Sequence, residues 1–178
     1  YTDSSGALQT CWTTSWGCST RMVGGLIMAH GDDHGLVLPP KIAPIQAVVI
    51  AVKDDEHTSN AVQDVTARLT QAGVRVRSDT RTDQSFGWRV TEWEIKGVPI
   101  RIEIGPRDLK AGQVVVTRRD TSEKTAFPID EVARAVPELL TTIQSDMFTA
   151  ARERLAARMV DASSVTVLRE YGVDEFLS

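Results

Sequence analysis

The run IQAVVIAV, residues 45–52, decides the fold of this chain. It is apolar apart from Gln46, it follows Pro44 and Lys53 comes directly after it, a pattern typical of a strand that is buried on both faces of a sheet. Helix and strand patterns alternate after it, which predicts an α/β fold, a mixed β-sheet with helices on both faces. We predict helices over 58–72, over 85–96 and from a cap at Asp130 toward 160, and strands over 74–77, 98–104, 113–117 and 124–127.

The composition is that of a globular protein. The chain has 178 residues, of which 42% are hydrophobic and 25% charged, enough for one core and part of a second domain. No apolar run is long enough to cross a bilayer, and no secretory signal opens the chain. Cys11 and Cys18 make neither a zinc nor a disulfide framework, and they suit a reducing cytoplasm. Because the chain begins with Tyr1, we expect a piece of a longer protein.

The charge is unevenly distributed. The net charge is −4, yet residues 68–119 hold eleven Lys and Arg against six Asp and Glu. A basic middle on an acidic chain is a plausible footprint for a phosphate backbone. A solvated surface is the alternative explanation for such a cluster.

Residues 14–46 form the most specific stretch of the chain. A strand pattern over 7–14 leads into it, and Arg21 precedes an apolar helical run over 22–29. A cation at the start of a helix suits a flat anionic ligand, because the helix N-terminus offers free N–H groups and Arg adds a planar fork. A proline-rich linker follows, and we place a domain boundary near residue 43.

Five short blocks in this stretch occur in one order with close spacing: TSWG (14–17), STR (19–21), HGDD (30–33), GLVLPP (35–40) and APIQ (43–46). They resemble the third signature motif of a class II aminoacyl-tRNA synthetase, and in detail the prolyl-tRNA synthetase family of the archaeal/eukaryotic-like type. The resemblance implies a catalytic, ATP-contacting role for Arg21, with Trp16, Gly17 and Ser19 lining the ATP and aminoacyl pocket. It also implies that Cys18 is a small buried hydrophobic residue.

The same resemblance implies a division of the chain into three parts. Residues 1–43 would be the C-terminal strand–helix element of the catalytic domain with its linker, and residues 44–160 the anticodon-binding domain. Residues 161–178 would begin a C-terminal extension. The mixed sheet predicted above is the fold that such an anticodon-binding domain has.

A second informative block is GWRVTEWEIKGVPIRIEIGPRDL, residues 87–109. It resembles the segment of prolyl-tRNA synthetases that reads the two guanines of the proline anticodon, which implies binding roles for Val90, Glu94, Arg101 and Arg107. These residue types suit guanine independently of the resemblance. A carboxylate accepts hydrogen bonds from the N1–H and N2–H groups of guanine, and Arg donates hydrogen bonds to its O6 and N7 atoms. A surface ion pair between Glu94 and Arg101 is the simpler alternative.

For the parent protein, the resemblance implies ATP-dependent ligation of proline to its tRNA. It also implies Mg²⁺ with the ATP, a homodimer, a cytoplasmic location and no membrane partner. The first two class II motifs are absent from these residues, so we expect the segment alone to be inactive and to bind no cofactor or metal. The polar cluster at 30–34 fits a helix end better than a metal site. Two alternatives remain: another synthetase of the group, such as the threonyl enzyme, or a non-catalytic tRNA-binding or regulatory module of the same fold.

Overall fold

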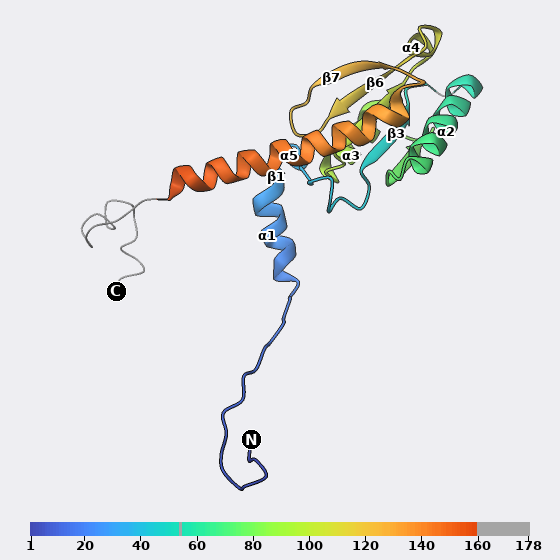
Figure 1. Ribbon diagram of the computed structural model, residues 1–178. Helices are drawn as coiled ribbons and strands as arrows, with labels where there is room; N and C mark the ends of the chain where they lie inside the picture. The colour runs from blue at the N-terminus through green and yellow to red at the C-terminus, as the bar shows by residue number, and fades with distance from the viewer. Residues whose placement is uncertain (54, 160–178) are drawn as a thin grey trace.

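A five-stranded mixed sheet forms the centre of the computed structural model, which describes residues 1–53 and 55–159 (Figure 1). The strand order is β4-β3-β5-β6-β7. The first three strands run parallel to one another, and the last two continue the sheet antiparallel. The strands are β3 (Ala47–Ala51), β4 (Val76–Asp79), β5 (Ile100–Ile104), β6 (Gln113–Arg118) and β7 (Lys124–Pro128). The predicted α/β class is therefore confirmed, while the predicted extension over 161–178 lies outside the described residues.

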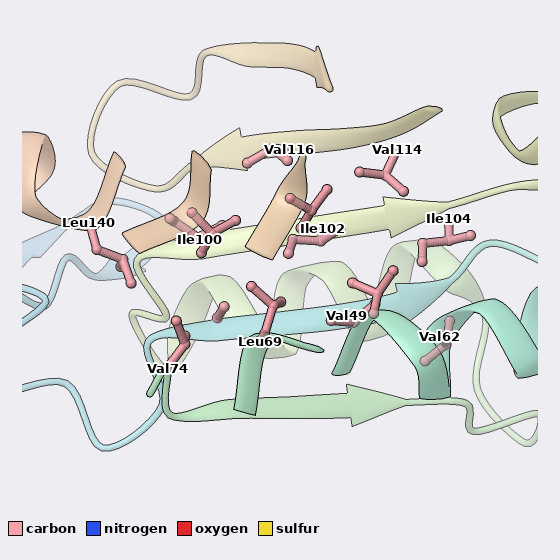
Figure 2. Close-up of a cluster of buried hydrophobic side chains, with 14 of the residues drawn as sticks. Val49, Val62, Leu69, Val74, Ile100, Ile102, Ile104, Val114, Val116 and Leu140 are labelled. Carbon is pink, nitrogen blue, oxygen red and sulfur yellow. The ribbon is translucent and has the colours of Figure 1, made fainter. Parts of the chain in front are cut away.

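The first face of the sheet carries the main hydrophobic core (Figure 2). The strand register aligns Val49, Ile102 and Val116 in one row on this face. Helices α2 (Glu56–Gln71) and α5 (Val132–Arg158) cover the row with apolar side chains such as Leu69 and Val136. Burial of this surface is the main favourable term for folding. Within residues 1–53 and 55–159, no helix combines the length and the apolar character needed to cross a membrane.

The second face of the sheet is covered differently. Helix α3 (Phe86–Ile95) packs Trp93 against Val48 and Ile50 of β3. Farther along the same face, β5 contributes Arg101 and β6 contributes Thr117, which are direct partners in the antiparallel register. The first face is therefore an apolar core, whereas the second changes from apolar under α3 to polar on β5 and β6.

A small hairpin and its helix precede the sheet. Helix α1 (Arg21–His30) leads into strands β1 (Gly31–Asp32) and β2 (Gly35–Leu36), which pair antiparallel. The hairpin lies against the end of α3: the Leu38 N–H donates to the Gly97 carbonyl at 3.3 Å, and a β-carbon at Gly97 would lie 2.6 Å from the Leu36 Cβ. Helix α1 itself buries none of its residues and points away from the sheet (Figure 1).

Three local predictions are wrong. Residues 7–14 form no regular strand in the described chain, where the segment makes only an isolated bridge between Thr2 and Leu8, because a strand needs a neighbouring strand for its backbone groups. Asp130 does not cap α5; it pairs with Arg68 at 3.0 Å instead. Cys18, which we expected to be a small buried residue, is exposed.

Gly97 provides a test of the docked hairpin. It has φ +70°, so Gly97→Ala would strain the backbone and press against Leu36. Gly73 has φ +80° with no atom within 4 Å of a β-carbon, which makes Gly73→Ala the matched control for backbone strain alone. We expect the control to lose about 1–2 kcal/mol of unfolding free energy, and Gly97→Ala to lose a further ~1–3 kcal/mol. Urea unfolding of both variants measures this difference, and equal losses would show that the hairpin does not pack there.

Candidate nucleic-acid interface

Arg101 is held between two carboxylates at the start of β5. Its Nη1 lies 2.7 Å from Glu94 Oε1 on α3, and its Nε lies 2.8 Å from Glu103 Oε1 on the same strand. The residue is only 8% exposed. Because a charge this deeply placed is costly without partners, the two carboxylates fix the position of the guanidinium. The ion pair between Glu94 and Arg101, given above as the simpler alternative to base reading, is thus present, although it is largely buried rather than on the open surface.

The spacing between these two residues follows from a tight connection. Helix α3 ends at Ile95 and β5 begins at Ile100. Gly97 makes the turn at positive φ, with its N–H bonded to the Glu94 carbonyl at 2.9 Å. The chain therefore returns at once onto the sheet, and the last turn of the helix lies beside the start of the strand.

The pair opens into a cavity of about 260 Å³ between α3 and the β6–β7 turn. Residues at and beside that turn, among them Arg119, Ser122 and Lys124, line the other side of the cavity. Arg119 closes one side: it makes contacts of 2.6 and 2.8 Å with the Asp32 carboxylate of the hairpin. The cavity is lined by Val48, Trp93, Glu94, Val98, Arg101, Thr117, Arg118, Arg119, Ser122 and Lys124.

Sequence reasoning missed the β6 and β7 side of this cavity. Thr117 lies directly opposite Arg101 in the sheet, and Lys124 lies opposite Thr117. These residues follow Arg101 in sequence by 16 and 23 positions, so only the strand register places them together. An alternating pattern would have assigned Thr117 to one face of β6, but no local signal sets which residue of β5 it meets.

The other two predicted base contacts lie outside this cavity's lining. Val90 is one helical turn before Glu94 and packs half-buried against the Trp93 cluster. Arg107 is exposed in the short helix α4 (Pro106–Lys110), beyond the far end of β5. The strand from Arg101 to Ile104 alone covers roughly 10 Å. The structure therefore places Arg107 well away from the Glu94–Arg101 pair.

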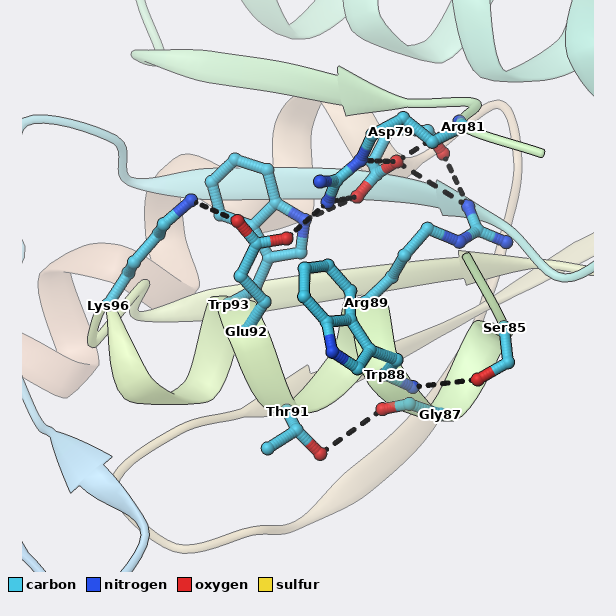
Figure 3. A network of polar contacts seen from close by, with 10 residues as sticks. All are labelled: Asp79, Arg81, Ser85, Gly87, Trp88, Arg89, Thr91, Glu92, Trp93 and Lys96. Carbon is cyan, nitrogen blue, oxygen red and sulfur yellow. Dashed lines mark hydrogen bonds and ion pairs between the residues drawn. The ribbon is translucent and has the colours of Figure 1, made fainter. Parts of the chain in front are cut away.

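A separate polar cluster holds α3 on the sheet (Figure 3). The buried Asp79 at the end of β4 accepts hydrogen bonds from Trp93 Nε1 at 2.6 Å and from Arg81 Nη2 at 2.7 Å. Arg89 is also buried, and it donates to the carbonyls of Asp79 and Ala51 at 3.0 and 2.8 Å. These contacts join two turns of α3 to the ends of β3 and β4, and so they fix the helix that carries Glu94.

The charge state of Asp79 follows from these contacts. Burial opposes ionisation of its carboxyl group, but the hydrogen bonds from Arg81 and Trp93 outweigh that effect and lower its pKa to about 2. Arg81 also lies 5.5 Å from the ring centre of Trp88, which is half exposed. Trp88 and Glu94 are six residues apart on α3 and project in different directions, so Trp88 does not line the cavity.

The predicted ATP-pocket residues lie in the N-terminal segment. Arg21 is the first residue of α1, while Trp16, Gly17 and Ser19 precede the helix in an irregular, exposed segment. Trp16 is 95% exposed.

Among residues 1–53 and 55–159, no group of three or more His, Cys, Asp or Glu is placed to hold a metal ion. In the cluster at 30–34, Asp32 is paired with Arg119, which lowers its pKa to about 2 chiefly through their hydrogen bond.

Comparison with known proteins defines the class of this domain. Residues 46–139 match the family model described as "Anticodon binding domain". These residues include the whole sheet together with α2, α3 and α4. The chain therefore belongs to the family of anticodon-binding domains.

Individual relatives are more specific. The chain is 54% identical over 160 residues to a proline–tRNA ligase of Frankia casuarinae, covering 90% of the chain and 34% of the relative. It is 44% identical over 161 residues to that of Cenarchaeum symbiosum, covering 88% and 34%. The prolyl-tRNA synthetase of Cryptosporidium parvum, solved with L-proline and AMP, is similar with a TM-score of 0.75, 39% identity and coverage of 79% of this chain and 31% of that one. The chain thus spans about a third of the length of these relatives.

Asp79 should make the fold sensitive to acid. Its pKa in the folded protein is about 2, below the ordinary value of about 3.9. Its carboxylate therefore contributes stability that is full above about pH 4 and is lost as the pH falls toward 2, in total roughly 2 kcal/mol. We expect the unfolding free energy of the wild type to fall more steeply between pH 5 and 2.5 than that of Asp79→Asn. Parallel pH profiles in urea unfolding would refute this role for the carboxylate.

Proposed function

We propose that this chain reads the anticodon of proline tRNA as part of a proline–tRNA ligase. One observation carries the proposal: the Glu94–Arg101 pair lines a cavity within a domain of the anticodon-binding family. The identity of 54% to a proline–tRNA ligase supports proline rather than threonine as the amino acid of the parent enzyme.

The chemistry of the pair suits guanine. The Glu94 carboxylate can accept from guanine N1–H and N2–H, which lie side by side on one edge of the base. A guanidinium carries five N–H donors. Arg101 therefore has N–H groups left after its two carboxylate contacts, and these groups can donate hydrogen bonds to guanine O6. Single-stranded loops are read through such edge contacts on unstacked bases. The cavity of about 260 Å³ is below the usual range for small-molecule sites, and it suits one base rather than a whole nucleotide.

The second guanine would lie farther along the same strand. Arg107 is exposed beyond the end of β5, where it can donate to a base edge or to a phosphate. Val90 is one turn before Glu94 on α3 and offers an apolar contact to a base beside the cavity. The distance between Arg101 and Arg107 along the chain supports two separate base sites.

The parent enzyme would activate proline with ATP and transfer it to the tRNA, acting as a homodimer in the cytoplasm. Arg21 would bind ATP and stabilise charge in the adenylation transition state, with Trp16, Gly17 and Ser19 lining the pocket. Trp16 is exposed and α1 has no buried residue, which supports a surface that the remainder of the enzyme covers. Magnesium would bind with the ATP phosphates, and we assign no described residue as its ligand. We keep the proposed boundary near residue 43, which the family match beginning at 46 supports.

Base reading can be tested with variants of Glu94 and Arg101, and Glu92 on the same helix provides the control. Glu94→Gln and Arg101→Ala should each weaken binding of the chain to the anticodon stem-loop of proline tRNA by roughly 10- to 100-fold. They should have little effect once adenines replace the two anticodon guanines. Glu92→Gln is the matched control, because Glu92 pairs with Lys96 and Arg81 rather than with Arg101. If the wild type binds both RNAs equally and only salt changes its affinity, the surface contacts phosphates without reading bases.

The catalytic part of the proposal has its own test. The isolated chain should support no proline-dependent exchange of pyrophosphate into ATP, because it spans only about a third of its relatives. In the full-length parent, Arg21→Ala should reduce this exchange by at least about 100-fold, as expected when a charge-stabilising group is lost. Exchange by the isolated chain, or full activity of the variant, would contradict these assignments.

A further inference from the structure

Thr117 occupies an unexpected position in the cavity. Its backbone pairs with Arg101 on one side and with Lys124 on the other, so the three residues form one row across β5, β6 and β7. Side chains that are directly opposite in neighbouring strands project from the same face of a sheet. Thr117 is therefore the central member of a row whose other members are cations, and it lines the cavity with both of them.

The hydroxyl of Thr117 is buried without a partner. The residue is only 5% exposed, and among residues 1–53 and 55–159 no group hydrogen-bonds to its Oγ1. A buried hydroxyl that lacks a partner costs free energy. The preceding residues of β6 are three valines in succession, residues 114–116, and valine has nearly the same shape as threonine. Valine at 117 would thus suit the free protein better, which implies that the hydroxyl acts in a bound state.

We propose that Thr117 is a specificity-determining residue whose hydroxyl forms a third contact to the base held by Glu94 and Arg101. This proposal rests on the proposed function, because it concerns the same cavity. A hydroxyl can donate or accept a hydrogen bond, so it forms one with a polar atom of guanine that neither the carboxylate nor the guanidinium contacts. A base without a suitable polar atom at that point gains nothing from the hydroxyl, so it binds more weakly than guanine.

The variant Thr117→Val separates this role from a structural one. It removes the hydroxyl and keeps the shape and the β-branching of the side chain. If the hydroxyl serves only the bound state, the variant should unfold at the same temperature as the wild type or a higher one. Its affinity for the guanine-containing stem-loop should fall by about 3- to 10-fold, the usual effect of losing one neutral hydrogen bond. Its affinity for the adenine-substituted stem-loop should not change.

Two further variants complete the experiment. Thr117→Ser restores the hydroxyl without the methyl group, and it should recover the guanine preference even if it is less stable. Thr125→Val is the matched control: Thr125 pairs with Val116 and projects from the opposite face of the sheet, so its removal should leave both affinities unchanged. All four proteins are compared by anisotropy with the two labelled stem-loops at one salt concentration.

The outcomes distinguish the two proposals. If the wild type prefers the guanine stem-loop and Thr117→Val keeps that preference in full, the Thr117 proposal fails and the anticodon-reading function stands. Equal losses in Thr117→Val and Thr117→Ser also overturn it, because the methyl group would then be responsible. If the wild type shows no guanine preference, both proposals fall together.

Discussion

The unequal covering of the two sheet faces is the constraint on which this structure depends. Strand β3 is buried on both sides, so helices must lie on both faces. Two helices, α2 and α5, cover the first face with an extended core, while α3 is the one helix within residues 1–53 and 55–159 that packs on β3 from the second face. The polar side chains of β5 and β6 therefore lie beside the edge of a single helix. A cavity at that edge results from the fold itself, and its chemistry combines Glu94 of α3 with Arg101, Thr117 and Lys124 from one row of the sheet.

Positioning of α3 then determines the chemistry. Asp79, Arg89 and Trp93 attach the helix to the ends of β3 and β4 by buried polar contacts. At its other end, Gly97 returns the chain to the sheet, and the hairpin packs there through Asp32 and Arg119. Glu94 is consequently held from two sides, at 2.7 Å from Arg101. A pair held in this way loses little further side-chain entropy when it binds a base, which favours affinity.

Much of the fold could be predicted from the sequence, because hydrophobic periodicity is local. The apolar run at 45–52 contains β3, and the helix predicted over 58–72 corresponds to α2. The adjacency of Glu94 and Arg101 was also predictable, since a tight turn separates them. Thr117 could not be found, because its place beside Arg101 depends on long-range strand register. The strand predicted over 7–14 failed for a related reason: a strand pattern indicates a strand only where a partner strand exists.

The central claim is that one guanine of the anticodon enters the cavity that Glu94 and Arg101 line. Nitrogen-15 NMR of the Arg Nε–H and Trp Nε1–H groups during titration with the anticodon stem-loop tests it directly. The account predicts that the Arg101 signal shifts with the guanine stem-loop and not with its adenine-substituted form. The Trp88 signal, on another side of α3, should remain in place. Equal shifts of Arg101 with both RNAs, or shifts confined to Trp88 and Arg81, would contradict the account.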